Sequence, residues 1–196
     1  QPLKAAKDPQ TMVNEIEATT NKLLKDNKFV VMLGGEHSIT TGLARAYKKK
    51  YPNMSILQLD AHGDTRESFE GSPYNHACIM ARVREFCPVV QVGIRSIDEE
   101  ETKKMDMQRV FFAHEIHNNE KWMQKAIDLL TENVLITIDL DVFDPGIMPS
   151  TGTPEPGGLG WYQVIAFLKK VIAQKNVVGF DVVELCPNPQ NKAPDF

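Results

Sequence analysis

Short continuous runs of apolar residues alternate along the chain with longer segments whose apolar residues recur at helical spacing. We predict strands at six runs: 29–33, 54–59, 89–93, 110–112, 134–138 and 177–183. The runs 29–33 and 134–138 are typical of buried strands, and 29–33 is expected to be buried on both faces. Helices are expected after Asp8-Pro9 and in four segments between the strands: 38–50, 75–86, 122–130 and 161–174. Strands that alternate with helices favour a three-layer α/β/α fold with a mostly parallel central sheet.

The composition narrows the class of protein. The chain has 196 residues, 42% of them hydrophobic, which suits one globular domain. A net charge of −4 argues against nucleic acid or an anionic membrane as a partner, and no apolar stretch is long enough to span a bilayer. Cys78, Cys87 and Cys186 form no close ligand pair, so we expect free thiols and a cytoplasmic location.

Side chains capable of chemistry follow four of the predicted strands. They are Glu36 and His37 after Leu33; Asp60, His62 and Asp64 after Leu59; Asp139 and Asp141 after Ile138; and Glu184 after Val183. In sheets of this kind, ligands bind outside the carboxyl ends of the strands. Because residues two positions apart on an extended segment point the same way, the side chains within each motif can converge.

Each motif alone has an ordinary structural explanation, since a histidine such as His37 often serves only as a hydrogen-bonding residue. Together they favour metal binding, because clustered carboxylates repel one another and are costly to bury without cations. The candidate ligands are His37, Asp60, His62, Asp64, Asp139 and Asp141. Six ligands are more than one zinc site usually takes, and they are enough for two metal ions. A carboxylate-rich set with imidazole and no thiolate favours Mn²⁺ first, and Mg²⁺, Fe²⁺ or Co²⁺ are the less favoured alternatives.

These motifs, in this order and followed by Thr151-Gly152-Thr153-Pro154, resemble the ureohydrolases, the binuclear manganese family of arginase and agmatinase. The resemblance runs from about Phe29 to Glu184. It implies one manganese held by His37, Asp60, Asp64 and Asp139. It implies a second held by Asp60, His62, Asp139 and Asp141, with Asp60 and Asp139 bridging. It also implies an arginase/deacetylase-like fold, with 1–196 a single catalytic domain incomplete at one or both ends, and a homo-oligomer, a trimer or a hexamer.

The same resemblance implies a hydrolase that cleaves a guanidino group to urea and an amine, by attack of a hydroxide shared between the metals. Asp64 would orient the hydroxide and pass on its proton, Glu184 would bind the guanidinium, and His76 would shuttle protons. The segments 65–77, 93–96 and 151–159 look most like agmatinase, which converts agmatine to putrescine and urea. Arginine, guanidinobutyrate and formiminoglutamate are alternative substrates, and a non-catalytic binding or regulatory homologue is the alternative of a different class.

Several residues carry competing explanations. His76 is nearly as well explained as a solvent-facing histidine at a helix N-terminus, and His114 and His117 are expected to be structural or solvent-facing. Cys186 is expected to be a buried inert thiol, with a place in the pocket wall as the alternative. Ser96 and Glu99 have the spacing of a capping box.

Overall fold

A parallel β-sheet forms the centre of the molecule. In the computed structural model, which describes residues 2–195, six strands form this sheet in the order β1-β6-β5-β2-β3-β4, and every neighbouring pair is parallel. The strands are β1 (Val30–Leu33), β2 (Met54–Leu59), β3 (Val89–Ile94), β4 (Val110–Phe112), β5 (Asn133–Asp139) and β6 (Asn176–Val183). All six predicted strands are confirmed.

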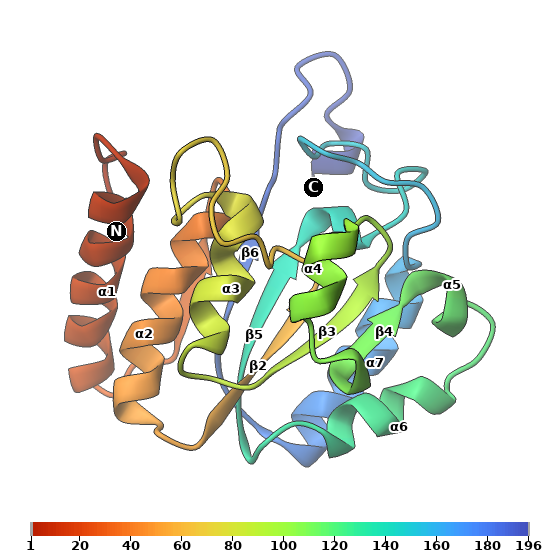
Figure 1. Cartoon of the computed structure of the whole chain (residues 1–196), viewed down its shortest axis with the longest axis horizontal. Coiled ribbons are helices and arrows are strands. Elements are labelled where there is room, and N and C mark those ends of the chain that lie inside the picture. The colour runs from red at the N-terminus through yellow and green to blue at the C-terminus, as the bar shows by residue number, and fades with distance from the viewer. Residues whose placement is uncertain (1, 196) are drawn as a thin grey trace.

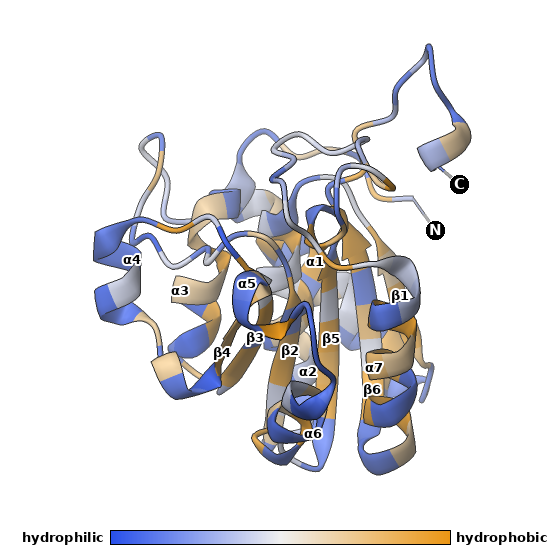
Figure 2. Cartoon of the chain, turned by 90° about the vertical axis from the view of Figure 1, so that its right-hand side faces the viewer, coloured by the Kyte–Doolittle hydropathy of each residue, from blue (hydrophilic) through white to orange (hydrophobic). Residues whose placement is uncertain are grey.

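Helices cover both faces of the sheet and complete the three predicted layers (Figure 1). They are α1 (Pro9–Lys25), α2 (Thr40–Lys50), α3 (Ile79–Arg84), α4 (Glu99–Lys104), α5 (Ala113–Ile116), α6 (Lys121–Asp128) and α7 (Trp161–Gln174). The apolar sides of α1, α2 and α3 pack on one face, and those of α6 and α7 pack on the other. Figure 2 shows the apolar residues concentrated in the strands between these layers. None of the helices within 2–195 is long and apolar enough to cross a membrane.

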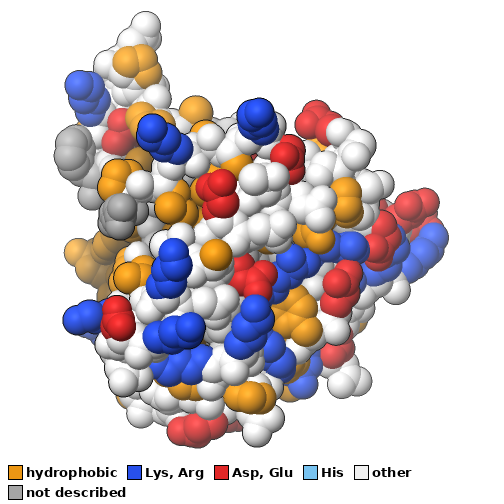
Figure 3. Space-filling model, turned by 90° about the vertical axis from the view of Figure 1, so that its left-hand side faces the viewer, with side chains coloured by type: hydrophobic (Ala, Val, Ile, Leu, Met, Phe, Trp, Pro, Cys, Tyr) orange, Lys and Arg blue, Asp and Glu red, His pale blue; other side chains and the backbone are white. Residues whose placement is uncertain are grey.

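The first helix begins as its sequence predicts. Asp8 caps α1 by accepting a hydrogen bond from the Thr11 backbone N–H at 2.9 Å, and Pro9 is the first helical residue. The outer surface on this side of the molecule carries charges of both signs, with hydrophobic side chains scattered among them (Figure 3). Lys49 Nζ, for example, lies 2.5 Å from Glu17 Oε1.

Two helix starts differ from the prediction. Short 3₁₀ helices, His37–Ile39 and His76–Cys78, precede α2 and α3, so that both predicted helices begin later than expected. These two turns carry His37 and His76 toward the carboxyl edge of the sheet, where the candidate site lies.

The predicted capping box at Ser96 and Glu99 is wrong. The box that opens α4 is formed by Asp98, which accepts from the Glu101 backbone N–H at 2.8 Å, and by Glu101 Oε2, which accepts from the Asp98 backbone N–H at 3.3 Å. Ser96 instead donates its hydroxyl to Glu155 Oε1 at 2.9 Å, which ties it to the loop after β5.

The prediction that 29–33 is buried on both faces is also wrong. β1 is an edge strand, and Val31 and Leu33 are 45% and 79% exposed. The core beneath α6 and α7 includes residues of β5 and β6 but none of β1 among the described residues.

Strand register brings the candidate residues together. β2 and β5 pair Leu59 with Ile138, so that the next residues, Asp60 and Asp139, leave adjacent strands at the same level. β5 and β6 pair Asp139 with Val183, which places Glu184 one step further on. The carboxyl edge of the sheet therefore collects groups from segments that are far apart in sequence.

Candidate metal centre

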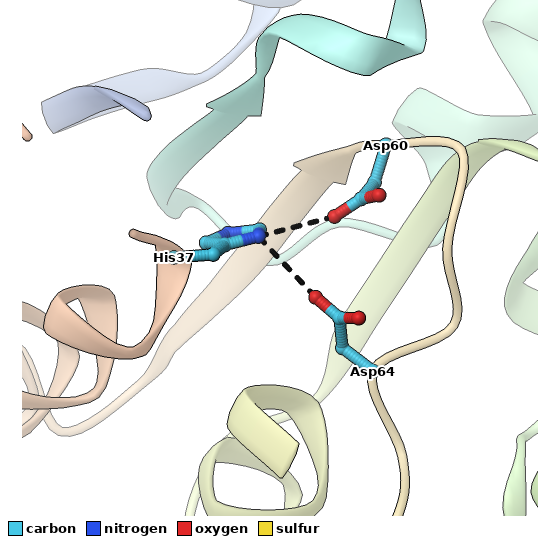
Figure 4. Close-up of side chains that lie close together, drawn as sticks. All are labelled: His37, Asp60 and Asp64. Atoms are coloured by element: carbon cyan, nitrogen blue, oxygen red, sulfur yellow. Dashed lines mark ion pairs between the residues drawn. The ribbon is translucent and has the colours of Figure 1, made fainter. Parts of the chain in front are cut away.

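One imidazole nitrogen of His37 faces three carboxylates. His37 Nδ1 lies 3.2 Å from Asp60 Oδ2, 3.3 Å from Asp64 Oδ2 and 3.2 Å from Asp139 Oδ2. Figure 4 shows the ring between α2 and the sheet, with this nitrogen pointing at Asp60 and Asp64. The four side chains come from three strand ends and form the first of two groups.

The second group shares Asp60 with the first. His62 Nδ1 lies 2.9 Å from Asp141 Oδ2 and 3.6 Å from Asp60 Oδ1. Asp60 therefore turns one carboxylate oxygen toward each histidine, which is the arrangement a bridging ligand needs. Asp139 contacts His37 through Oδ2, and its Oδ1 accepts from the Asp141 backbone N–H at 2.9 Å.

These groups shift one another's pKa values because they are buried within a few ångströms. Burial raises the pKa of Asp64 to about 7, helped by the charge of Asp60, and the same two causes raise the pKa of Asp139 well above its usual value. Burial disfavours protonated imidazoles, but the close carboxylates favour them and outweigh the effect of burial. The pKa of His37 is therefore raised well above its ordinary value, and that of His62 is raised to about 11. Protons and cations compete for this centre.

The residues present suit divalent cations. His37 Nδ1 is buried and has no hydrogen-bond partner, although three carboxylate oxygens surround the space in front of it. Two sets of donor atoms are close enough to hold an ion each, one made by His37, Asp60 and Asp64 and the other by Asp60, His62 and Asp141. An oxygen-rich donor set with imidazole fits manganese and similar ions.

Buried polar residues behind the centre hold its ligands, and sequence reasoning missed them. Gln58 donates to Asp60 Oδ2 at 2.7 Å, and Gln91 donates to Gln58 Oε1 at 2.6 Å. Thr137 Oγ1 lies 2.9 Å from His37 Nε2 and donates to Asp181 Oδ1 at 2.6 Å. The available signal was a buried polar residue inside a largely apolar strand, which is costly unless it has a partner.

A cavity of about 570 Å³ opens in front of these ligands. His76 lines it and is not a purely solvent-facing residue, since its Nδ1 lies 3.2 Å from Glu36 Oε1. That hydrogen bond raises the pKa of His76. Glu184 also lines the cavity, and its Oε1 accepts from the His37 backbone N–H at 2.5 Å. Burial raises the pKa of Glu184.

Other residues considered in the sequence lie away from this cavity. His114 and His117 are exposed near α5, in agreement with the structural or solvent role expected of them. The expectation of a buried Cys186 is wrong, because the chain has left the sheet by this residue and its thiol is exposed; it does not line the cavity. Cys78 and Cys87 are buried free thiols.

One basic side chain supports the site from the outside. Arg95 Nη2 donates to the Asp141 and Glu155 carbonyl oxygens at 2.6 and 2.8 Å, and so ties the loop after β5 to the end of β3. It lies in the segment that looked like agmatinase in the sequence, where its structural role was not predicted.

The parallel sheet, its two helical layers and the acidic, histidine-containing cluster at the carboxyl edge define an α/β protein with a candidate divalent-metal centre. The chain belongs to the arginase family, whose family model matches residues 2–194.

Similar proteins carry more specific names. The chain is 45% identical to the N(1)-aminopropylagmatine ureohydrolase of Synechocystis sp. over 181 residues, which cover 90% of this chain and 59% of that protein. It is 38% identical to the agmatinase of Pyrococcus horikoshii, covering 79% of this chain and 54% of that protein. The crystal structure of agmatine ureohydrolase of Thermoplasma volcanium superposes with a TM-score of 0.84 at 32% identity, covering 98% of this chain and 67% of that one. The chain thus spans less than two thirds of the length of these two sequence relatives.

Proposed function

We propose that this chain carries the active site of a manganese-dependent ureohydrolase, which hydrolyses a guanidino compound to urea and an amine. The observation that carries the proposal is the pair of ligand groups that share Asp60, one centred on His37 and the other on His62. Membership of the arginase family supports it.

The ligand assignments follow the two groups. We assign one manganese to His37, Asp60, Asp64 and Asp139, and the other to Asp60, His62, Asp139 and Asp141. The proximity of Asp60 to both histidines supports its bridging role, and the bridging role of Asp139 rests on the motif match. When bound, the two ions supply the Lewis acidity that makes hydroxide from water near neutral pH.

The remaining groups handle substrate and protons. Hydrolysis adds water across the bond between the guanidinium carbon and the substrate's alkyl nitrogen, and that nitrogen leaves as an amine after it gains a proton. We assign this proton transfer to Asp64, because its carboxylate lines the cavity beside the other proposed ligands. Glu184 projects its carboxylate at the cavity and would bind the guanidinium. His76, oriented by Glu36, would exchange protons with solvent.

The charge around the cavity selects among substrates. Glu36, Asp98 and Glu184 line it together with the ligands, and Arg66 is the only Lys or Arg among its described lining residues. Arg66 Nη2 already pairs with Asp98 Oδ2 at 3.1 Å, and its Nε lies 3.6 Å from Glu101 Oε2. No unengaged cation among these lining residues is therefore left for a substrate carboxylate, whereas a second ammonium group would be attracted. We infer a guanidino amine in preference to arginine or guanidinobutyrate.

Two guanidino amines remain as candidates. Agmatine is favoured by the sequence motifs and by the name of the Pyrococcus relative. N(1)-aminopropylagmatine is favoured by the higher identity to the Synechocystis relative. We also propose a homo-oligomer, from the family resemblance, and a cytoplasmic location, because free thiols suit a reducing compartment.

A substrate panel tests the function. Urea should be released with Mn²⁺ from agmatine, from N(1)-aminopropylagmatine or from both, at a kcat/KM well above that for arginine or guanidinobutyrate. Binding of two Mn²⁺ ions without urea from any of the four compounds would refute the hydrolase. A preference for arginine would refute the charge argument but would leave the proposed hydrolase activity in place.

A further inference from the structure

The imidazole of His37 has two nitrogen atoms in different surroundings. Nδ1 faces the carboxylates of the proposed metal centre, as Figure 4 shows, and Nε2 lies 2.9 Å from Thr137 Oγ1 on β5. A neutral histidine can bind a metal through Nδ1 only if its proton is on Nε2. The affinity of the centre therefore depends on what determines the position of this proton.

A chain of hydroxyl and carboxylate groups lies behind Nε2. Thr137 Oγ1 donates to Asp181 Oδ1 at 2.6 Å, and Thr40 Oγ1, from the first turn of α2, donates to Asp181 Oδ2 at 2.8 Å. Thr137 and Asp181 occupy paired positions on β5 and β6. All three side chains are fully buried, so that water does not substitute for any member of the chain.

The number of available protons determines the tautomer. An ionised carboxylate only accepts hydrogen bonds, and a threonine hydroxyl has one proton to donate. Because Thr137 gives its proton to Asp181, its oxygen is left as an acceptor toward His37. Nε2 must then be the donor, and Nδ1 keeps its lone pair for a cation.

We propose that Asp181 and Thr137 are positioning residues, which hold His37 in the Nε2–H tautomer and thereby maintain the metal affinity of the centre. The inference rests on the metal binding proposed above but on neither the reaction nor the substrate. Groups behind a metal-bound histidine typically change metal affinity by about 10–100-fold when they are removed.

Asp181→Asn is the decisive variant, because it preserves shape but replaces one acceptor oxygen by an NH₂ donor. If that NH₂ faces Thr137, the threonine accepts from it and turns its own proton toward Nε2, which favours the wrong tautomer. If it faces Thr40, the Thr40 hydroxyl can only accept from it, and the Thr40 proton loses the oxygen to which it donates. Thr137→Val removes the acceptor, and Thr137→Ser restores it. Thr40→Val is the matched control, since it removes a hydroxyl from the same carboxylate on the side away from His37.

The electron paramagnetic resonance signal of free Mn²⁺ measures how tightly the full chain binds Mn²⁺. This measurement needs no activity assay. We expect the Kd of one site to rise at least tenfold in Asp181→Asn and Thr137→Val, with Thr137→Ser and Thr40→Val within about threefold of wild type. In ¹⁵N-histidine spectra of the zinc-loaded wild type, the His37 proton should be on Nε2.

Opposite results would overturn the inference. Folded Asp181→Asn and Thr137→Val that bind Mn²⁺ as wild type does would exclude the positioning role while leaving the metal centre in place. A His37 proton on Nδ1 would exclude both the positioning role and the assignment of Nδ1 as a metal ligand. If Asp181→Asn does not fold, the Thr137→Val and Thr137→Ser pair decides. A wild-type chain that binds no Mn²⁺ would overturn both this inference and the proposed function.

Discussion

Asp64→Asn should stabilise the metal-free protein at neutral pH. The Asp64 side chain is buried, and its Oδ2 lies 3.3 Å from His37 Nδ1. Its backbone has φ of +54°, in the left-handed region, which asparagine tolerates as well as aspartate does. The substitution therefore removes a charge with little change of shape or backbone strain.

The magnitude follows from the pKa of this carboxyl. Folding raises it from an ordinary 3.8 to about 7, so the folded state binds more protons than the unfolded state between these values. Stability contributed by this group therefore falls as pH rises from about 4 to 7, by on the order of 4 kcal/mol. In EDTA, Asp64→Asn should match wild type near pH 4 and exceed it by up to about 4 kcal/mol at pH 7.

Thermal unfolding in EDTA at several pH values measures this difference, because about 1 kcal/mol moves the Tm of a chain of this size by roughly 2–4 °C. Added Mn²⁺ should reduce the difference at pH 7. A ligand at 100 times its Kd stabilises a protein by about 2.7 kcal/mol, and Asp64→Asn should lose most of this gain at one site. Asp26→Asn, at an exposed position, is the control. An Asp64→Asn protein less stable than wild type in EDTA by the same amount at pH 4 and pH 7 would refute the reasoning.

Three further substitutions separate the roles of neighbouring residues. Asp141→Ala removes the closest partner of His62, so metal content after dialysis and urea release should fall together; normal manganese content would contradict its assignment. Glu184→Gln should retain both metals and lower kcat/KM at least tenfold, and an unchanged kcat/KM would remove it from substrate binding. Glu36→Gln should lower the pKa of His76, measured by NMR titration, because the hydrogen bond from Glu36 raises it; an unshifted titration would exclude this pairing.

Short-range geometry explains which parts of the site could be predicted. Asp60 with His62, and Asp139 with Asp141, lie two positions apart where apolar strands end, and the structure places each pair within one cluster. His37 lies on a separate turn, and its place just after the end of another predicted strand associated it with the others. The local pattern was sufficient because parallel strands end at one edge.

Long-range contacts explain what could not be predicted. Thr137 and Asp181 each interrupt an apolar strand, but the contact between them depends on the register of strands 44 positions apart. The exposure of Leu33 depends on which strand forms the edge of the sheet, and that of Cys186 on where the chain leaves β6. None of these follows from the periodicity of a single segment.

The strand β6 links the two sides of the site. Asp181 lies behind His37, and Glu184, three residues later, lies in front of it, where the backbone adopts a φ of +67° as it leaves the sheet. A slip of β6 by one residue would turn Asp181 to the opposite face and move Glu184 away from the His37 backbone N–H. Gly179 helps to hold the register, since a Cβ there would lie only 2.9 Å from the Val30 carbonyl oxygen. The same strand pairing therefore orients the metal ligand and places the acid proposed to bind the guanidinium, so the two functions depend on one register.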